Sequence, residues 1–197
     1  IKEVLGLMLE QIKLGHQIYV VSPLVEEDES LNLTSINLLK EKLSLAFKNL
    51  FRIEIIHGKM KTTEKESIMN DFKNNQIKIL IATTVIEVGI DVSNATMMVI
   101  FNAERFGLAT LHQLRGRVGR SDLQSYCYLI SDSDNDRLKV MEESNDGFYI
   151  SQKDFEMRGH GDLFGVKQHG DMSFKLANLK NDYNILLFAN EDAKKFI

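Results

Sequence analysis

Short apolar runs alternate with longer segments of helical periodicity along most of this 197-residue chain. Five of these runs are rich in strand-forming residues and nearly apolar throughout: 17–21, 52–56, 77–82, 97–101 and 126–130. Strands that are apolar on both faces are typical of a parallel sheet covered on both sides, because each right-handed crossover places a helix over the sheet. The pattern predicts an α/β fold with an open parallel sheet over residues 1 to about 130.

Two of the connecting segments have helical patterns. In KTTEKESIMNDFKNN, Thr63 and Glu66 have the spacing of a capping box, and an apolar face follows at Ile68, Met69 and Phe72. The segment LATLHQLRGRV, between the fourth and fifth runs, predicts a second helix that ends near residue 119.

The pattern changes from residue 131 onward. Charged helical stretches replace the apolar runs, followed by the glycine-rich segment RGHGDLFGVKQHG and by a helical pattern from about residue 173. We therefore expect two parts: a sheet domain over 1–130 and a smaller, mainly helical extension over 131–197.

Composition narrows the possible classes of protein. A net charge of -4 argues against a protein that coats nucleic acid through bulk charge, so any nucleic-acid contact must be local. The single cysteine, Cys127, excludes an intrachain disulfide and a multi-cysteine zinc site, and it fits a reducing compartment. No run approaches the roughly 18 apolar residues of a membrane-spanning helix. We expect a soluble cytoplasmic protein without membrane contacts.

In open parallel sheets, ligands bind beyond the carboxyl ends of the strands. After the third run, Thr83 and Thr84 offer hydroxyl and N–H groups to a phosphate backbone, Gly89 permits a tight turn, and Asp91 suits a ribose hydroxyl. The alternative is a second buried strand with Glu87 as a surface charge, and this stretch alone favours neither interpretation.

The segment HGKM follows the second run and precedes a predicted helix. It places His57, Gly58 and Lys59 where oriented N–H groups would suit an anion. His57 has no companion at metal-ligand spacing, so we do not expect a metal here. A structural role is the alternative for a single histidine.

The segment HQLRGRVGR concentrates fixed positive charge at Arg115, Arg117 and Arg120. Arginine presents a rigid fork of donors to phosphate oxygens. If the helix persists, Arg117 and Arg120 project from one face, as a pair aimed at a nucleoside triphosphate. A solvated basic face is the alternative, although two glycines inside a helix would serve something other than helix stability. Arg115 suits solvent and a DNA phosphate equally.

Two motifs of a complete nucleotide hydrolase are missing. The chain has no G-x-x-x-x-G-K-[ST] loop to cradle phosphates, and no acidic pair after a strand to hold Mg²⁺. Arginines without a phosphate cradle do not hydrolyse a nucleotide efficiently, since catalysis also needs the phosphates to be positioned. Because the chain also lacks an initiating methionine, we expect a piece of a longer protein.

Together these motifs carry a resemblance. YVVSPL, ATTVIEVGIDV and HQLRGRVGR resemble, in this order, motifs IV, V and VI of the second, RecA-like motor domain of superfamily 2 helicases. HGKM, LHQLRGRVGRS and DGFYISQKDFEMRGHGDLFGVKQHG are similar to the RecG family of fork-remodelling DNA helicases, with the Mfd coupling factors as near relatives. The resemblance spans roughly residues 16–170.

The resemblance implies a role for each matching residue. Arg117 and Arg120 correspond to arginine fingers on the γ-phosphate of ATP. Nucleotide-side positions are implied for Gln113, Glu87, Gly89 and Asp91. DNA contacts are implied for His57, Gly58, Lys59, Thr83 and Thr84. Arg158 and Gln168 match the element that couples ATP turnover to translocation.

The same resemblance implies a function. The chain would be the C-terminal half of an ATP-dependent DNA helicase that remodels stalled forks and Holliday junctions in repair and recombination. ATP and Mg²⁺ would be held mainly by an absent first motor domain, so this piece would bind no cofactor tightly and be inactive alone. Its partners would be branched double-stranded DNA and the wedge and first motor domains of one bacterial, nucleoid-associated polypeptide. The alternatives are a non-catalytic module that binds nucleic acid or a partner, and the equivalent domain of Mfd.

Overall fold

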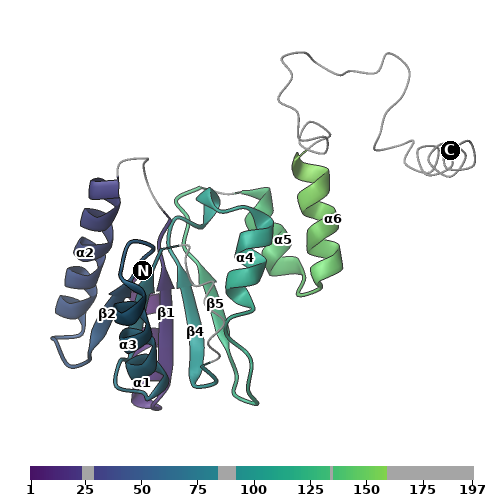
Figure 1. Ribbon diagram of the computed structural model, residues 1–197. Helices are drawn as coiled ribbons and strands as arrows, with labels where there is room; N and C mark the ends of the chain where they lie inside the picture. Colours follow the sequence, from purple (N-terminus) through teal and green to yellow (C-terminus); the bar gives the residue numbers. More distant parts are fainter. Residues whose placement is uncertain (24–28, 84–91, 134, 159–197) are drawn as a thin grey trace, which may run out of the picture. The chain divides into compact units, whose positions relative to one another are not determined.

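The computed structural model describes residues 1–23, 29–83, 92–133 and 135–158. The chain divides into two compact units, Ile1–Asn145 and Asp146–Ile197. The first unit contains the sheet, and the described part of the second unit is one helix (Figure 1).

Five parallel strands form the sheet of the first unit in the order β2-β3-β1-β4-β5. The strands are β1 (Gln17–Val21), β2 (Ile53–Ile56), β3 (Ile79–Ala82), β4 (Ala95–Ile100) and β5 (Tyr126–Leu129). Each begins and ends within two residues of a predicted apolar run, which confirms the predicted parallel sheet. The strands form where nearly every residue is β-branched or otherwise apolar, because both faces of the central strands are buried.

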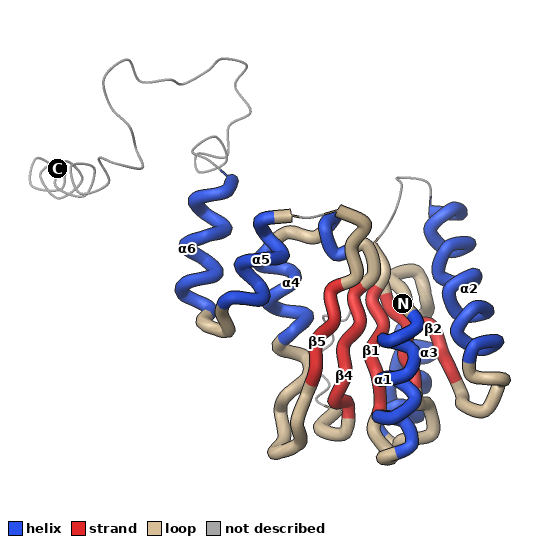
Figure 2. Tube along the Cα trace, turned by 180° about the vertical axis from the view of Figure 1, so that it is seen from behind, coloured by secondary structure: helices blue, strands red, loops and turns tan. Residues whose placement is uncertain are grey.

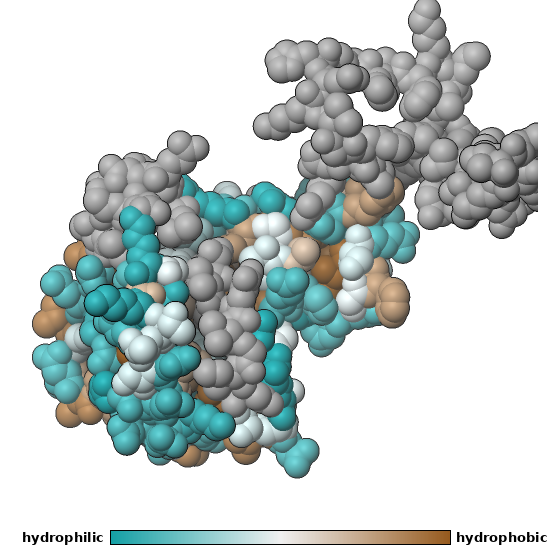
Figure 3. All heavy atoms as spheres, viewed as in Figure 1, coloured by the Kyte–Doolittle hydropathy of each residue, from teal (hydrophilic) through white to brown (hydrophobic). Residues whose placement is uncertain are grey.

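Helices cover both faces of the sheet (Figure 2). On one face lie α1 (Lys2–Lys13) and α2 (Glu29–Ala46), whose buried residues share a core with alternate residues of the strands, such as Ile18 and Val20. On the other face lie α3 (Thr62–Lys73) and α4 (Leu108–Arg115). There the rings of Tyr19 and Phe72 lie 5.0 Å apart. The outer surface of α3 is hydrophilic (Figure 3). None of the helices described is long and apolar enough to cross a membrane.

The predicted apolar face of α3 is confirmed, but its predicted capping box is wrong. Met69 and Phe72 are buried. The helix begins at Thr62 with Lys61 as its N-cap, and no side chain caps it. Thr63 therefore already lies in the first helical turn, whereas a capping residue needs the extended backbone that Lys61 adopts.

The helix α4 ends four residues earlier than predicted. Its C-cap is Gly116, after which the N–H groups of Arg117 and Val118 donate to the carbonyls three residues before them, at 3.0 and 3.3 Å. Gly119 then turns the chain with a φ of +79°, which L side chains rarely adopt. The expectation that Arg117 and Arg120 share one helical face is therefore wrong, since both follow the helix.

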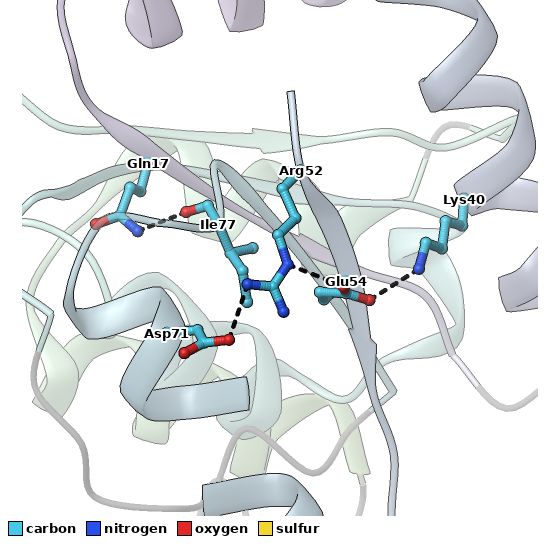
Figure 4. A network of polar contacts seen from close by, with 6 residues as sticks. All are labelled: Gln17, Lys40, Arg52, Glu54, Asp71 and Ile77. Atoms are coloured by element: carbon cyan, nitrogen blue, oxygen red, sulfur yellow. Dashed lines mark hydrogen bonds and ion pairs between the residues drawn. The ribbon is translucent and has the colours of Figure 1, made fainter. Parts of the chain in front are cut away.

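A buried glutamine ties the start of β1 to the end of α3. Gln17 is fully buried, and its Nε2 donates to the carbonyl oxygens of Phe72 and, at 2.7 Å, of Ile77 (Figure 4). Its Oε1 accepts from Asn94 Nδ2 at 3.2 Å. Because each polar atom of the amide has a partner, its burial costs little.

Charged side chains line the outer edge of β2. Arg52 contacts Asp71 at 2.8 Å and Glu54 at 3.1 Å, and Lys40 contacts Glu54 at 2.8 Å (Figure 4). Burial alone would raise the pKa of Glu54, but the hydrogen bonds from Lys40 and Arg52 outweigh it and lower that pKa. A charged edge also discourages pairing with another strand.

The helix α5 (Asp136–Glu143) belongs to the first unit, although it follows the boundary predicted near residue 131. Arg137 holds it there by donating to the carbonyl oxygens of Phe106 at 3.2 Å and Glu104 at 3.1 Å. Glu104 belongs to the short 3₁₀ helix η1 (Ala103–Arg105). In the second unit, α6 spans Gly147–Arg158, and the later predicted elements lie outside the described residues. The division at residue 131 remains a prediction.

Candidate functional site

The register of the sheet aligns the last residues of its five strands. Ala82 pairs with Val21 and Ile56, Val21 also pairs with Ile100, and Ile100 pairs with Leu129. The residues that follow these strands therefore lie side by side at one edge of the sheet, which we call the carboxyl edge.

The predicted DNA-contacting residues of two loops meet at this edge. His57 follows β2 and Thr83 follows the neighbouring strand β3, directly after the paired residues Ile56 and Ala82. The N–H of Ser22, which follows β1, donates to the Ala82 carbonyl at 3.1 Å. Thr83 is buried, with 3% of its surface exposed, so it adds almost no exposed surface to this edge.

The loop after β2 presents its polar groups outward. Gly58 and Lys59 are exposed and His57 is half-buried. The N–H of Met60 donates to the His57 carbonyl at 3.3 Å, which closes a turn. Lys65 Nζ, from α3, donates to the Gly58 carbonyl at 2.6 Å. The loop is thus shaped by its own turn and by one lysine of the following helix.

The arginine-rich loop lies at the opposite end of the sheet. Because α4 starts beyond the carboxyl end of β4 and runs back toward the start of β5, residues 116–125 lie near the amino ends of these strands (Figure 1). The hydroxyl of Ser121 donates to the carbonyl of Ser93, which precedes β4, at 3.0 Å. The loop that carries Arg117 and Arg120 and the loop that carries His57 therefore lie at opposite edges of one sheet.

The predicted finger residues differ in their surroundings. Arg120 is exposed, and its Nε donates to the Gly116 carbonyl at 3.1 Å. Arg117 is half-buried, and its guanidinium makes no hydrogen bond or ion pair within the described part of the chain. Gln113 is exposed on the last turns of α4. Guanidinium groups held at this loop suit the oxygens of an anionic phosphate.

Arg115 turns inward to the end of α5, a contact that neither role considered for it from the sequence, solvation or a DNA phosphate, included. Its Nη1 donates to the carbonyl oxygens of Met141 at 2.7 Å and Ser144 at 2.9 Å, and its Nη2 lies 3.2 Å from His112 Nδ1. Burial lowers the pKa of Arg115. The last carbonyls of a helix lack partners within it, so this arginine caps the end of α5. No spacing in the sequence indicated that contact.

Next to Arg115 lies a cavity of about 230 Å³ that is lined in part by Cys127, Leu129 and Met141. Burial raises the pKa of the Cys127 thiol to about 11, so the thiol stays protonated at neutral pH. A protonated, partly buried thiol is a poor nucleophile and a poor metal ligand. Elsewhere in the described residues, no three histidine, cysteine or acidic side chains gather as metal ligands.

Sequence reasoning missed one carboxylate at the carboxyl edge. Glu104 has one oxygen, Oε2, that is buried and without a hydrogen-bond partner among the described residues. Burial would raise the pKa of Glu104, but hydrogen bonds from its own N–H, from Ser131 and from Asn102 lower it. Asn102 has a left-handed backbone, with φ +48°. No pattern in the sequence indicated this ionised carboxylate, because Asn102 and Ser131, whose side chains donate to it, follow two different strands.

Several predicted site residues lie wholly or partly outside the described residues. Those that lie outside the described residues are Thr84, Glu87, Gly89, Asp91 and Gln168. Arg158 is the last residue of α6, and only its backbone is described. Their roles stay predictions.

A five-stranded open parallel sheet with helices on both faces is the architecture of a RecA-like motor domain. The family described as the helicase conserved C-terminal domain matches residues 1–122. The chain belongs to this family.

Individual proteins with similar sequences give a more specific comparison than the family does. The chain is 43% identical over 198 residues to the ATP-dependent DNA helicase RecG of Bacillus subtilis and 46% identical over 197 residues to that of Streptococcus pneumoniae. Each match covers 98% of this chain. The chain spans 29% of the length of these relatives, so most of each relative has no counterpart in it.

Solved structures agree with this assignment of the fold. A structure of RecG bound to a three-way DNA junction is similar with a TM-score of 0.69 and 38% identity, over 94% of this chain and 24% of that chain. Domain 2 of the DEAD-box helicase Mss116p, bound to an RNA duplex, is similar with a TM-score of 0.56 and 21% identity, over 73% of this chain and 55% of that chain. The second likeness supports the fold alone.

Proposed function

We propose that this chain is the second motor domain, with its C-terminal extension, of a RecG-type ATP-dependent DNA helicase that remodels branched DNA. The observation that carries the proposal is the match to RecG helicases over 98% of the chain, joined to an arginine loop and a DNA-side loop at opposite edges of one sheet. A solved relative of the same name is bound to a three-way DNA junction.

On the nucleotide side, Arg117 and Arg120 act as arginine fingers. The first motor domain of the same polypeptide holds ATP and Mg²⁺, since this chain has no phosphate-cradling loop. When the two domains close, the two guanidinium groups approach the γ-phosphate and stabilise charge in the transition state. Such a finger accelerates phosphoryl transfer about 10³- to 10⁵-fold, which corresponds to roughly 4 to 7 kcal/mol of barrier. Gln113, Glu87, Gly89 and Asp91 complete the nucleotide side.

On the DNA side, the carboxyl edge contacts the phosphate backbone. The exposed Gly58 and Lys59, with the half-buried His57, form the contact surface. Thr84, which follows the buried Thr83, contributes at the neighbouring strand end. A few such contacts at a time reconcile DNA binding with a net charge of -4, and they make the affinity depend on salt.

The extension beyond residue 131 transmits the movement. Arg158 and Gln168 belong to the element that couples ATP turnover to translocation on duplex DNA. The cap that Arg115 places on α5 supports this role, because it joins α4, which is followed by the arginine loop, to the first helix beyond residue 131. An N-terminal wedge of the same polypeptide selects forks and junctions, and the complete enzyme works at the bacterial nucleoid.

The central test is the substitution Arg120→Ala in the complete enzyme. We expect DNA-stimulated ATP hydrolysis to be abolished while ATP binding, measured with a fluorescent ATP analogue, stays largely intact, because the finger acts on the transition state. The substitution Lys42→Ala, at an exposed position on α2, is the control and leaves turnover unchanged. Near-normal turnover of the Arg120 variant would contradict the assignment and favour a non-catalytic binding module.

A further inference from the structure

The residue that directly follows Arg120 makes a bond that crosses the fold. The hydroxyl of Ser121 donates to the carbonyl oxygen of Ser93 at 3.0 Å and accepts from the N–H of Leu123 at 3.4 Å. A serine hydroxyl has a single proton, so donating it to Ser93 and accepting from Leu123 fixes the orientation of the group. The two bonded segments are 28 residues apart in the sequence.

This bond joins the two segments that face the nucleotide in the proposed function. Ser93 stands two residues after Asp91 and leads into β4, where Ala95 and Thr96 are buried. The segment around Ser93 is therefore anchored to the rigid sheet. Ser121, in contrast, is in the loop that carries Arg120. The hydroxyl of Ser121 thus fastens the arginine loop to the framework of the sheet.

Arg120 is constrained on both of its sides. Before it, Gly119 turns the chain with a φ of +79°, and after it, Ser121 is held against Ser93. Its own Nε donates to the Gly116 carbonyl at 3.1 Å. Without the bond from Ser121, the C-terminal side of this short turn would lose a hydrogen bond to the strand framework.

We propose that Ser121 is a positioning residue for Arg120: its hydroxyl holds the arginine loop at a fixed distance from the segment that precedes β4. The inference rests on the proposed role of Arg120 as a finger. The finger stabilises charge only where its guanidinium meets the γ-phosphate, and a displacement of about 1 Å at such a site can cost on the order of 100-fold in rate.

The same loop offers a matched control. Ser125 is also half-buried, but its hydroxyl donates to the carbonyl of Leu123 at 3.3 Å, two residues away within the loop. Replacing Ser125 by alanine removes a hydroxyl of the same size from the same loop without breaking a bond to the strand framework. A difference between the two alanine variants therefore reports the bond to Ser93.

The experiment compares Ser121→Ala, Ser121→Thr and Ser125→Ala in the complete enzyme, by DNA-stimulated ATP hydrolysis and by thermal unfolding. For Ser121→Ala we expect kcat to fall about tenfold or more while KM for ATP stays within about twofold, because the finger acts in the transition state and not in ATP binding. Threonine retains the hydroxyl and recovers most of the rate. Ser125→Ala retains the wild-type kcat, and all three variants unfold at similar temperatures.

Three results would overturn the inference. The first is a Ser121→Ala kcat equal to that of Ser125→Ala while Arg120→Ala is inactive, which leaves the proposed function standing. The second is a loss of kcat in Ser121→Ala that accompanies a lower unfolding temperature and that threonine does not restore, which makes the bond merely structural. The third is normal turnover of Arg120→Ala, which removes the finger itself and with it the proposed function.

Discussion

The inward-facing Arg115 gives a prediction about stability that separates it from its neighbour Arg117. Replacing Arg115 by methionine keeps an apolar stem but removes the two donors that reach the carbonyls of Met141 and Ser144 at 2.7 and 2.9 Å. The end of α5 would then lose its cap. Arg117 is the matched comparison, because it lies two residues away and its guanidinium has no hydrogen-bond partner within the described residues.

The size of the effect follows from these two bonds. A hydrogen bond from a charged donor contributes about 1.5 to 3 kcal/mol when buried. Arg115 is only half-buried, and water can rehydrate the freed carbonyls, so we discount the two bonds together to about 2 kcal/mol. For a domain of this size, 1 kcal/mol shifts the unfolding temperature by about 2 to 4 °C, so Arg115→Met lowers it by roughly 4 to 8 °C.

The assay is thermal unfolding of the 197-residue chain, followed by circular dichroism. We expect Arg117→Met to leave the unfolding temperature within about 1 °C of the wild type and, if the proposed finger role holds, to abolish ATP hydrolysis in the complete enzyme. Arg115→Lys, which can reach one carbonyl but not both, falls between the two. Equal unfolding temperatures for Arg115→Met and Arg117→Met would refute the capping role.

Two further predictions concern charge. We expect Lys59→Gln in the complete enzyme to weaken DNA binding and to reduce the slope of log affinity against log salt by about 1, as measured by fluorescence anisotropy. The control Lys73→Gln, at the far end of α3, should change neither the affinity nor the slope. An unchanged slope for Lys59→Gln would show that this lysine does not contact DNA. The lowered pKa of Glu54 means that its ion pairs stabilise the fold above the unfolded pKa of about 4.3 and cease to do so as pH falls through the folded value. The difference in urea stability between wild type and Glu54→Gln should therefore shrink in acid, and a difference that is constant from pH 7 to pH 3 would argue against the ion pairs.

The sequence predicted the strands well and the helix ends poorly. Strands such as 79–82 are buried on both faces, so every position must be apolar, and such a run is visible without knowledge of the partners. The end of α4 depends on which carbonyls find donors after Gly116, and the arginines that follow are compatible with a helix by propensity alone. The capping box failed for a similar reason, since the spacing of Thr63 and Glu66 does not decide where the chain first becomes helical.

Residue types and their order along the chain were enough to identify the class of protein and to name the arginines and the HGKM loop as candidates. The amino-acid sequence alone determined these, because a motif is a local property of the chain. Only the tertiary structure decided where the candidates lie. Parallel pairing of β2 with β3 sets His57 beside Thr83 at the carboxyl edge, and the return of α4 carries Arg117 and Arg120 to the opposite edge.

The same holds for the three arginines of HQLRGRVGR. They are chemically identical in the sequence, but Arg115 still belongs to the helix and faces the carbonyls of α5, while Arg117 and Arg120 follow the turn beyond it. Arg115 is distinguished as a structural residue by its hydrogen bonds to carbonyls that are 26 and 29 positions away in the sequence. Arg117 and Arg120 remain the candidates for catalysis. Such contacts form only when the chain has folded, since they depend on packing between α4 and α5 and not on any local pattern.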